Sequence, residues 1–473
     1  MGTARPFEDI PYITLPGNYS THLGPFLASM YDQHGPVFRT TYLGKDLIYL
    51  AGPEANRFVL LSDRLKFSYH EGWGQLYGVL DVYGNGLLTM DGAEHSEHRR
   101  MMNPAFTMSY MNHYLSLMNR IIRQRIATWA ASGAIDIYQE ARKITFDIAA
   151  EALAGLKAGP EVERFRELFV HLLMQGMRAR GSRLKDELSH LLQLKIQERR
   201  ESPTDDVLGM LVQARNNQGK PLSDEQLIAH INILLVAGHE TATSLSTWLL
   251  YLLSQHPEYA QRVLVEQDEL LGNRIDTDLA LEEIKQMKVL DNALSEAERM
   301  YPPIGHGPRG VVEDFVFHGY HIPAGIFIFY AIAATHLNPH IFEEPMQFDP
   351  DRFAPPREEH KKAPFALVGF GGGPRMCIGI NFAKIEIKIL VTHILRQYHL
   401  ELLPNQDITQ FYRATGMPLH GIKMRVLERE QTRVYSGIMA NLDSVARSEG
   451  YCHDRTTSDI KSGSISASRS ECI

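Results

Sequence analysis

The stretch from Ser223 to Gln255 constrains the fold of this chain most strongly, because it predicts a single, very long helix. Ser223 and Gln226 have the spacing of a capping box, in which two side chains satisfy free backbone amides at the start of a helix. Apolar residues then recur at helical spacing as far as Leu249, and Pro257 predicts that the helix ends near Gln255. At about 1.5 Å per residue, this helix would be roughly 50 Å long. We therefore expect it to cross the core of a large domain.

The middle of this predicted helix carries the sequence AGHET (237–241), which is unusual for an apolar core. Gly238 in a helix interior costs about 1 kcal/mol relative to alanine, so its presence needs a reason. One explanation is close packing against another helix. Another is that Ala237 and Gly238 leave a groove for a flat cofactor, beside which Glu240 and Thr241 could relay protons. A buried acid and a buried alcohol both require polar partners, which favours the second explanation.

A second constraint is the segment FGGGPRMCIG (370–379), which leads into a helix predicted from about Ile378 to Gln397. Three consecutive glycines followed by a proline indicate an irregular turn in which backbone segments approach closely. Cys377 then lies at the start of the helix, where the helix dipole and unpaired amides stabilise a thiolate and tune any metal bound to it. Arg375 adds positive charge nearby. These features make Cys377 a candidate metal ligand.

Taken alone, Cys377 leaves other possibilities open. An isolated cysteine is most often a small buried hydrophobic residue. A glycine-rich turn before a helix also occurs in dinucleotide-binding folds, but Pro374 stands where the GxGxxG motif needs its third glycine. A nucleophilic cysteine would need a histidine partner, and the residues around Cys377 match no protease signature.

Composition narrows the class of protein. The net charge is −8 and no long Lys/Arg run is present, so we expect no nucleic-acid partner. Cys377, Cys452 and Cys472 are too few for a disulfide framework, which suits a reducing compartment. The apolar runs are far shorter than the roughly 20 residues of a membrane-spanning helix, and the N-terminus lacks an apolar signal segment. We predict a soluble, cytoplasmic protein with no transmembrane anchor.

The remaining patterns predict a mainly α fold with smaller β-sheet regions. Residues 37–44 and 46–52 are rich in β-branched and aromatic residues and predict a hairpin. Residues 71–92 are rich in glycine without a regular period and predict a long, mobile loop. From Ala93 to about residue 300 the pattern is helical, and short strands follow the Pro302-Pro303 pair.

The last part of the chain differs in composition from the rest. Residues 455–472 contain six serines and few apolar side chains, which are too few to order a segment by burial. We therefore predict one catalytic domain over residues 1–429 and a serine-rich, disordered tail over residues 430–473.

Two further motifs are weak by themselves. Glu296 and Arg299 stand three residues apart on a helix predicted to stop at Pro302, a spacing that is common in surface ion pairs. The segment FDPDRF (348–353) supplies another arginine, Arg352, in an aromatic-flanked coil.

Together, these motifs resemble those of the cytochrome P450 superfamily of haem-thiolate monooxygenases, over about residues 15 to 428. Phe370-x-x-Gly373-x-Arg375-x-Cys377-x-Gly379 resembles the haem-binding signature of that family, and Ala237-Gly238-x-Glu240-Thr241 resembles its oxygen-activation motif. Glu296-x-x-Arg299 and the segment containing Arg352 resemble its structural triad. All of them occur in the order of the family, which makes coincidence negligible.

The resemblance implies the cytochrome P450 fold, with haem between the long central helix and the cysteine-bearing helix. Cys377 would then be the iron ligand, and Glu240 and Thr241 the catalytic proton relay. Glu296, Arg299 and Arg352 would be structural. The other implied cofactor-binding residues are His95, Arg99, Ala237, Gly238, Arg309, Phe370, Arg375 and Gly379, of which His95, Arg99, Arg309 and Arg375 would hold the haem propionates.

The implied cofactors are haem b (iron protoporphyrin IX) and O2, with NAD(P)H acting indirectly through redox partners. One oxygen atom would enter a small hydrophobic substrate by hydroxylation or epoxidation. No flavin or iron–sulfur domain is recognisable, so we expect a separate ferredoxin or flavodoxin-type electron donor. The candidate basic docking face comprises Arg100, Lys361, Lys362 and Lys384.

The substrate pocket is expected to include residues near the central helix and near the strands after Pro303. The candidates are Leu234, Ile304, His306, Thr415 and Met417, together with the 71–92 segment. Two alternative functions stay open. One is a haem-thiolate peroxygenase, isomerase or dehydratase that needs no external electrons, against which Thr241 argues. The other is a non-enzymatic haem-binding sensor, for which a proton relay has no evident use.

Overall fold

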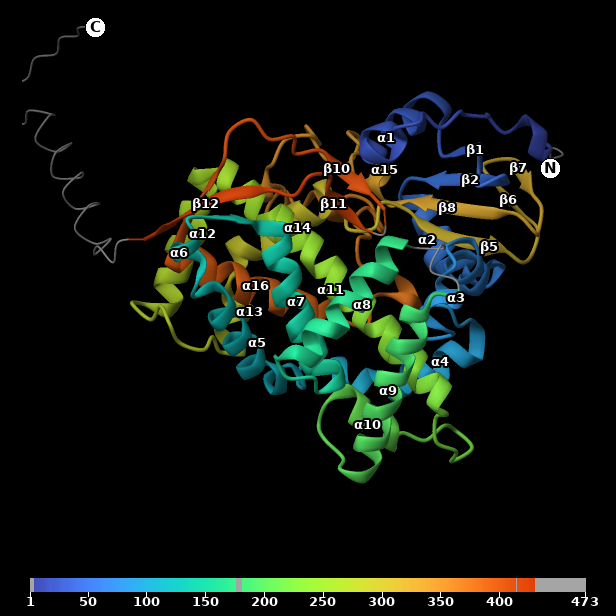
Figure 1. Cartoon of the computed structure of the whole chain (residues 1–473). Coiled ribbons are helices and arrows are strands. Elements are labelled where there is room, and N and C mark those ends of the chain that lie inside the picture. Colours follow the sequence, from blue (N-terminus) through green and yellow to red (C-terminus); the bar gives the residue numbers. More distant parts are fainter. Residues whose placement is uncertain (1–3, 176–180, 414, 430–473) are drawn as a thin grey trace, which may run out of the picture. The chain divides into compact units, whose positions relative to one another are not determined.

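The computed structural model describes residues 4–175, 181–413 and 415–429 (Figure 1). The chain divides into two units, Met1–Glu428 and Arg429–Ile473. The predicted tail, 430–473, lies outside the described residues, so its disorder stays a prediction.

Helices make up most of the first unit, as the periodicity predicts. In chain order they are α1 (Leu23–His34), α2 (Pro53–Arg57), α3 (Val79–Tyr83), α4 (Gly92–Met102), α5 (Met111–Ile126), α6 (Trp129–Ser132), α7 (Ile137–Ala154), α8 (Pro160–Gln175), α9 (Arg183–Glu201), α10 (Val207–Gln213), α11 (Asp224–Gln255), α12 (Pro257–Leu271), α13 (Leu281–Gln286), α14 (Lys288–Met300), α15 (Ile332–His336) and α16 (Ile380–Gln397). Among the described helices, none is long and apolar enough to span a membrane. The cytoplasmic location stays a prediction.

The strands form small sheets beside the helices (Figure 1). They are β1 (Val37–Tyr42), β2 (Lys45–Ala51), β3 (Phe67–Ser68), β4 (Ala134–Asp136), β5 (Gly307–Val311), β6 (Phe315–Phe317), β7 (Tyr320–Ile322), β8 (Phe327–Ala331), β9 (Tyr398–Leu402), β10 (Gln410–Tyr412), β11 (Gly416–Pro418) and β12 (Lys423–Glu428). The largest sheet has the order β1-β2-β8-β5-β3, in which only β2 and β8 pair in parallel. The predicted hairpin is the antiparallel β1–β2 pair.

The long helix α11 runs through the core, as its sequence predicts. The Ser223 hydroxyl accepts a hydrogen bond from the Gln226 amide, and the Gln226 side chain accepts one from the Ser223 amide, which completes the capping box. Trp248 and Leu249 are fully buried, as are side chains on most faces of the helix. A helix that is apolar on all sides is buried on all sides. It packs most extensively against α7.

The prediction of an irregular loop over residues 71–92 is wrong for much of that segment. A π-helical turn covers His70–Leu76, and α3 follows it. The glycines serve close packing there. A Cβ atom on Gly72 would lie 2.4 Å from the Pro308 carbonyl oxygen, and one on Gly74 would lie 2.7 Å from the Leu80 side chain. Gly72 thus lets the turn pack directly against β5, and Gly74 lets it pack against α3.

Candidate active site

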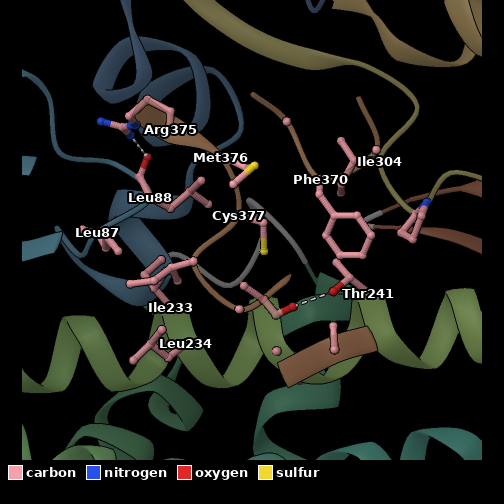
Figure 2. Close-up of a pocket in the computed structure, with 18 of the residues that line it drawn as sticks. Leu87, Leu88, Ile233, Leu234, Thr241, Ile304, Phe370, Arg375, Met376 and Cys377 are labelled. Carbon is pink, nitrogen blue, oxygen red and sulfur yellow. Dashed lines mark hydrogen bonds between the residues drawn. The ribbon is translucent and has the colours of Figure 1, made fainter. Parts of the chain in front are cut away.

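A cavity of about 280 Å³ lies between α11 and the glycine-rich turn that carries Cys377. Figure 2 shows the Cys377 sulfur pointing toward α11, with Thr241 on that helix and Phe370 beside it. Most of the residues predicted to form the site line this cavity: His95, Arg99, Leu234, Ala237, Gly238, Thr241, Ile304, Arg309, Phe370, Arg375, Cys377 and Gly379.

The turn before Cys377 depends on glycine for its geometry. Gly373 has a φ of 61°, in the left-handed region, and a Cβ atom there would lie 2.4 Å from the Leu60 carbonyl oxygen. The Cys377 amide donates to the Phe370 carbonyl oxygen at 2.8 Å, which closes the turn. The backbone therefore presents the sulfur to the cavity at the entrance of α16.

The surroundings of the Cys377 thiol act on its charge in opposite directions. Burial raises the pKa of the thiol, whereas the Gly379 amide and the positive charge of Arg99 lower it, and the net pKa is above its ordinary value. A free thiol here would keep its proton at neutral pH. Stabilising the thiolate requires a further positive charge at the sulfur, such as a metal ion.

The helix α11 opens onto the cavity over a short window. Ala237 is exposed to the cavity, while Gly238 and Thr241 are partly exposed. The Thr241 hydroxyl donates to the Ala237 carbonyl oxygen at 2.8 Å. A Cβ atom on Gly238 would lie 3.7 Å from Leu153, an ordinary contact distance. Helix packing therefore does not require glycine at this position, and a groove for a flat ligand explains it better.

One wall of the cavity carries a cluster of cations without counter-charges. Arg99, Arg309 and Arg375 line it, and none of them forms an ion pair with a carboxylate in the part of the chain that the structure describes. The buried Nε of Arg309 has no hydrogen-bond partner there. Tyr69 lies between two of these guanidinium groups, 3.4 Å from Arg309 and 3.6 Å from Arg375, measured to the ring centre. The sequence pattern did not single out Tyr69, because nothing in a lone aromatic marks it as a stacking partner.

The electrostatic effect of this cluster extends to its neighbours. Burial, with the charges of Arg309 and Arg99, lowers the pKa of Arg375 to about 10. Burial and the charges of Arg375 and Arg99 lower the pKa of His95 to about 3. A surplus of buried positive charge is costly unless an anion is bound. A thiol, a small-residue window and three unpaired arginines fit haem, whose two propionates supply the missing negative charge.

The predicted pair Glu240 and Thr241 is divided between two environments. Thr241 lines the cavity, but the Glu240 carboxylate points to the α7 side, where it pairs with the Arg142 Nε at 2.9 Å. It also accepts hydrogen bonds from the Tyr138 hydroxyl at 3.3 Å and from His239 at 3.1 Å. Although burial opposes ionisation, the His239 and Arg142 interactions hold the pKa of Glu240 at about 2. The sequence did not identify Arg142, which lies about a hundred residues away.

The predicted substrate residues are also divided. Leu234 and Ile304 line the cavity, as expected. His306 does not: its ring stacks on Phe329 at 4.1 Å and hydrogen-bonds Tyr77. Thr415 is buried and is not among the lining residues, and the Met417 sulfur contacts the Tyr138 hydroxyl. These three residues are therefore not among those that line this cavity, and their contact with substrate stays a prediction. Trp73, Leu87 and Leu88 line it from the 71–92 segment.

The three predicted triad residues do meet, and all are buried. Glu296 pairs with Arg299 at 2.7 Å and with Arg352 at 3.1 Å. Arg299 also donates to carbonyl oxygens of His336 and Pro345, and Arg352 pairs with Glu359 at 2.7 Å. The triad thus ties α14 to the coil that precedes the cysteine turn. Glu359 was not predicted.

The candidate docking residues have partners of their own. Lys361 pairs with Glu358, and Lys362 lies 3.8 Å from Glu359. The Arg100 guanidinium donates to Asn217. The Lys384 ammonium lies 5.4 Å from the ring centre of Phe370, next to the cysteine turn.

Comparisons with known proteins agree with this geometry. The Cytochrome P450 family model matches residues 6–173 and 160–426. A putative cytochrome P450 120 of Synechocystis sp. is 32% identical over 414 residues, which covers 85% of this chain and 92% of that protein. A β-amyrin 28-monooxygenase of Solanum lycopersicum is 28% identical over 411 residues, which covers 82% of this chain and 84% of that protein.

A solved structure supports the same family assignment. The retinoic acid-bound cyanobacterial CYP120A1 aligns with a TM-score of 0.79 at 30% identity, covering 89% of this chain and 99% of that one. The family match, the fold and the cavity that joins Cys377 to α11 lead to one conclusion. The chain belongs to the cytochrome P450 family and is an oxidoreductase of the haem-thiolate monooxygenase class.

Proposed function

We propose that this chain binds haem b through the Cys377 sulfur and inserts one oxygen atom from O2 into a hydrophobic organic substrate, by hydroxylation or epoxidation. The observation that carries the proposal is the cavity itself. It brings Cys377 opposite the open window of α11 and collects three arginines without counter-charges on one wall. When bound, haem supplies the dioxygen chemistry, for which a thiolate ligand donates electron density that favours O–O cleavage.

The residues around the cofactor have separate tasks in this proposal. The Gly379 amide and the Arg99 charge stabilise negative charge on the Cys377 sulfur. Arg309 and Arg375 bind the propionates, together with Arg99. Arg375 is held in place by donating to the Met90 and Leu88 carbonyl oxygens at 2.7 and 3.2 Å.

Thr241 is the proposed proton carrier on the cavity side of α11. Its hydroxyl donates to the Ala237 carbonyl oxygen, which leaves its lone pairs free to accept a hydrogen bond from water or substrate. Glu240 carries no proton near neutral pH, because its pKa is about 2. We therefore assign Glu240 to positioning α11 against α7, and not to delivering protons itself.

The rest of the cavity lining indicates a lipophilic substrate. It is mostly apolar, with Trp73, Leu87, Leu88, Ile233, Leu234 and Ile304 among its members. Burying such a surface favours a ligand with a large apolar area. The similar structure CYP120A1 contains retinoic acid, and the tomato relative is a β-amyrin monooxygenase. We propose an isoprenoid-type substrate on this basis.

Electrons are proposed to come from NAD(P)H through a separate ferredoxin or flavodoxin-type protein. Arg100, Lys361, Lys362 and Lys384 form the candidate docking set. Attraction between exposed charges is screened by salt. Reduction of the haem by such a donor is therefore expected to slow as ionic strength rises, which stopped-flow measurements would show.

The ligand assignment is tested by Cys377→Ser. The ferrous–CO complex of the unmodified protein is expected to show the red-shifted absorption of thiolate-ligated haem. The variant should lose that band, because a serine oxygen cannot replace the sulfur donor. If the band survives in the variant, another residue holds the iron.

The substrate proposal is tested by titrating the haem-loaded protein with lipophilic compounds. Displacement of the sixth iron ligand by a compound in the cavity changes the spin state, which is read from the absorption spectrum. Retinoids, triterpenes and fatty acids form the first panel, and Leu234→Phe is expected to weaken binding by filling the cavity. Turnover with peroxide but not with electron donors and O2 would favour a peroxygenase instead.

A further inference from the structure

His306 belongs to a polar and aromatic cluster that begins at the cavity and leads away from it. Trp73 lines the cavity, and its ring centre lies 5.4 Å from that of Tyr77. The Tyr77 hydroxyl lies 2.7 Å from the His306 Nε2. The opposite ring nitrogen, Nδ1, is buried and has no hydrogen-bond partner among the described residues. A phenol and an imidazole are thus paired directly behind a cavity tryptophan.

The cluster continues through Phe329 to the surface. The Phe329 ring lies 6.0 Å from Tyr77 and 5.5 Å from Tyr42, and the Tyr42 ring lies 6.4 Å from Tyr19. Tyr42 and Tyr19 are only partly buried. Burial, together with the Tyr42 phenol, raises the pKa of both Tyr77 and Tyr19, so these phenols keep their protons at neutral pH.

The chemistry of these side chains suits one-electron transfer. Tryptophan and tyrosine are the aromatic side chains that lose an electron most readily, and rings separated by short gaps exchange electrons by tunnelling. A phenol gives up an electron more easily when a base accepts its proton at the same time. The His306 Nε2, 2.7 Å from the Tyr77 hydroxyl, is placed to accept that proton. Burial lowers the pKa of His306 to about 3, so the ring is neutral before the electron leaves.

We propose that Trp73, Tyr77, Tyr42 and Tyr19, with His306 as proton acceptor, form an electron-supply path from the surface to haem at Cys377. This path, which rests on the proposed haem binding, would remove oxidising equivalents when no substrate occupies the cavity. For an organic hydroperoxide, the O–O bond breaks to give an alcohol and water. Two tyrosines each lose one electron and one O–H proton, which balances the reaction. A reductant in solution, such as ascorbate, then restores the phenols.

The chain offers a matched control pair. Trp248 and Tyr301 stack with ring centres 4.1 Å apart, closer than Trp73 and Tyr77, but neither lines the cavity. A path that starts at the cavity includes Trp73, and Tyr77 through its contact with Trp73, and it omits this control pair. Simple oxidation of stacked aromatic residues would not distinguish the two pairs.

The experiment mixes substrate-free, haem-loaded protein with cumene hydroperoxide and freezes it within the first turnover for electron paramagnetic resonance. A tyrosyl signal is expected in the unmodified protein. Tyr77→Phe should lose most of that signal and Trp73→Phe should delay it, whereas Tyr301→Phe should leave it unchanged. An identical signal in Tyr77→Phe and Tyr301→Phe would overturn the proposal.

A second readout needs no variant. Peptide mapping after the same treatment should find oxidation products at Trp73, Tyr77, Tyr42 and Tyr19 and none at Trp248 or Tyr301, with ascorbate suppressing them. Oxidation that follows solvent exposure alone would contradict the path. The ferrous–CO spectrum is recorded for every sample. Loss of the thiolate band would count against haem ligation by Cys377, whereas an intact band without oxidation along the path counts against this inference.

Discussion

At the scale of single residues, the arginines of the cavity wall are the most informative side chains. A fully buried guanidinium without a carboxylate destabilises a folded protein, because the lost hydration is not replaced. Arg309 is only 1% exposed, and its Nε has no partner among the described residues. Such a residue is best explained by an anion that it binds. Before the structure, Arg309 stood out only through the resemblance to the family, which implied that it binds a haem propionate.

Changing Arg309 to methionine is expected to have opposite effects on the two states of the protein. The haem-free protein should become more stable, because repulsion from Arg375 and Arg99 is relieved. Haem should bind more weakly, by about tenfold or more, since a hydrogen bond to a charged group is worth about 1.5–3 kcal/mol. Thermal unfolding of the haem-free protein and transfer of haem to apomyoglobin measure the two effects.

Arg100→Met provides the control for this comparison. It removes the same charge from an exposed position on α4, where the guanidinium contacts Asn217. Neither the stability of the haem-free protein nor haem affinity should change. If Arg309→Met lowers stability in both states, the arginine is structural and not an anion ligand.

At the scale of elements, the contact between α7 and α11 holds the central helix beside the cavity. Its polar part consists of the Glu240–Arg142 ion pair and a hydrogen bond of 2.7 Å between the Thr145 and Thr243 hydroxyls. Both groups are buried, so each depends on its partner for the hydrogen bonds lost on leaving water. This contact explains why an acid is tolerated inside an apolar helix.

Glu240→Gln is expected to destabilise the protein by about 3 kcal/mol at pH 7, because Arg142 would stay buried without a counter-charge. The pKa of Glu240 is about 2 in the folded state, below its ordinary value of 4.5. The stabilisation of the folded state by ionised Glu240 is therefore complete above pH 4.5 and is lost as the pH falls toward 2. Urea unfolding at several pH values should show that the difference in unfolding free energy between the unmodified protein and the variant becomes smaller in acid.

Glu187→Gln serves as the control, since Glu187 pairs with Arg164 at the surface. Water and salt screen exposed pairs, so this variant should change stability little at any pH. If the loss of unfolding free energy caused by Glu240→Gln stays constant down to pH 2, the carboxylate charge is not what stabilises the contact.

At the scale of the whole molecule, the catalytic unit is expected to fold without the serine-rich tail. Ending the chain after Arg429 removes a segment with too few apolar residues to contribute to a core. The unfolding temperature and the haem content should stay the same as in the full chain, as measured by calorimetry and absorption. A clear fall in either would show that the tail takes part in the fold.

Several parts of the fold and site could be predicted from local patterns. The α11 helix, its capping box and its end before Pro257 follow from periodicity and turn chemistry. The 71–92 segment could not be predicted, because the same glycines suit either a flexible loop or a tightly packed turn. Only the nearby β5 backbone distinguishes the two, and it lies more than two hundred residues further along the chain.

The sequence by itself indicated that Cys377 follows an irregular glycine turn, and that a long apolar helix elsewhere in the chain carries a small-residue window. Those features depend on backbone propensity and short-range spacing. The tertiary structure alone decided which polar groups face the cavity. It turned Glu240 toward Arg142 and His306 toward Tyr77, while leaving the three arginines without carboxylate partners in the described chain. The physical reason is that a side chain's charge and role depend on its neighbours, and those come from distant parts of the chain.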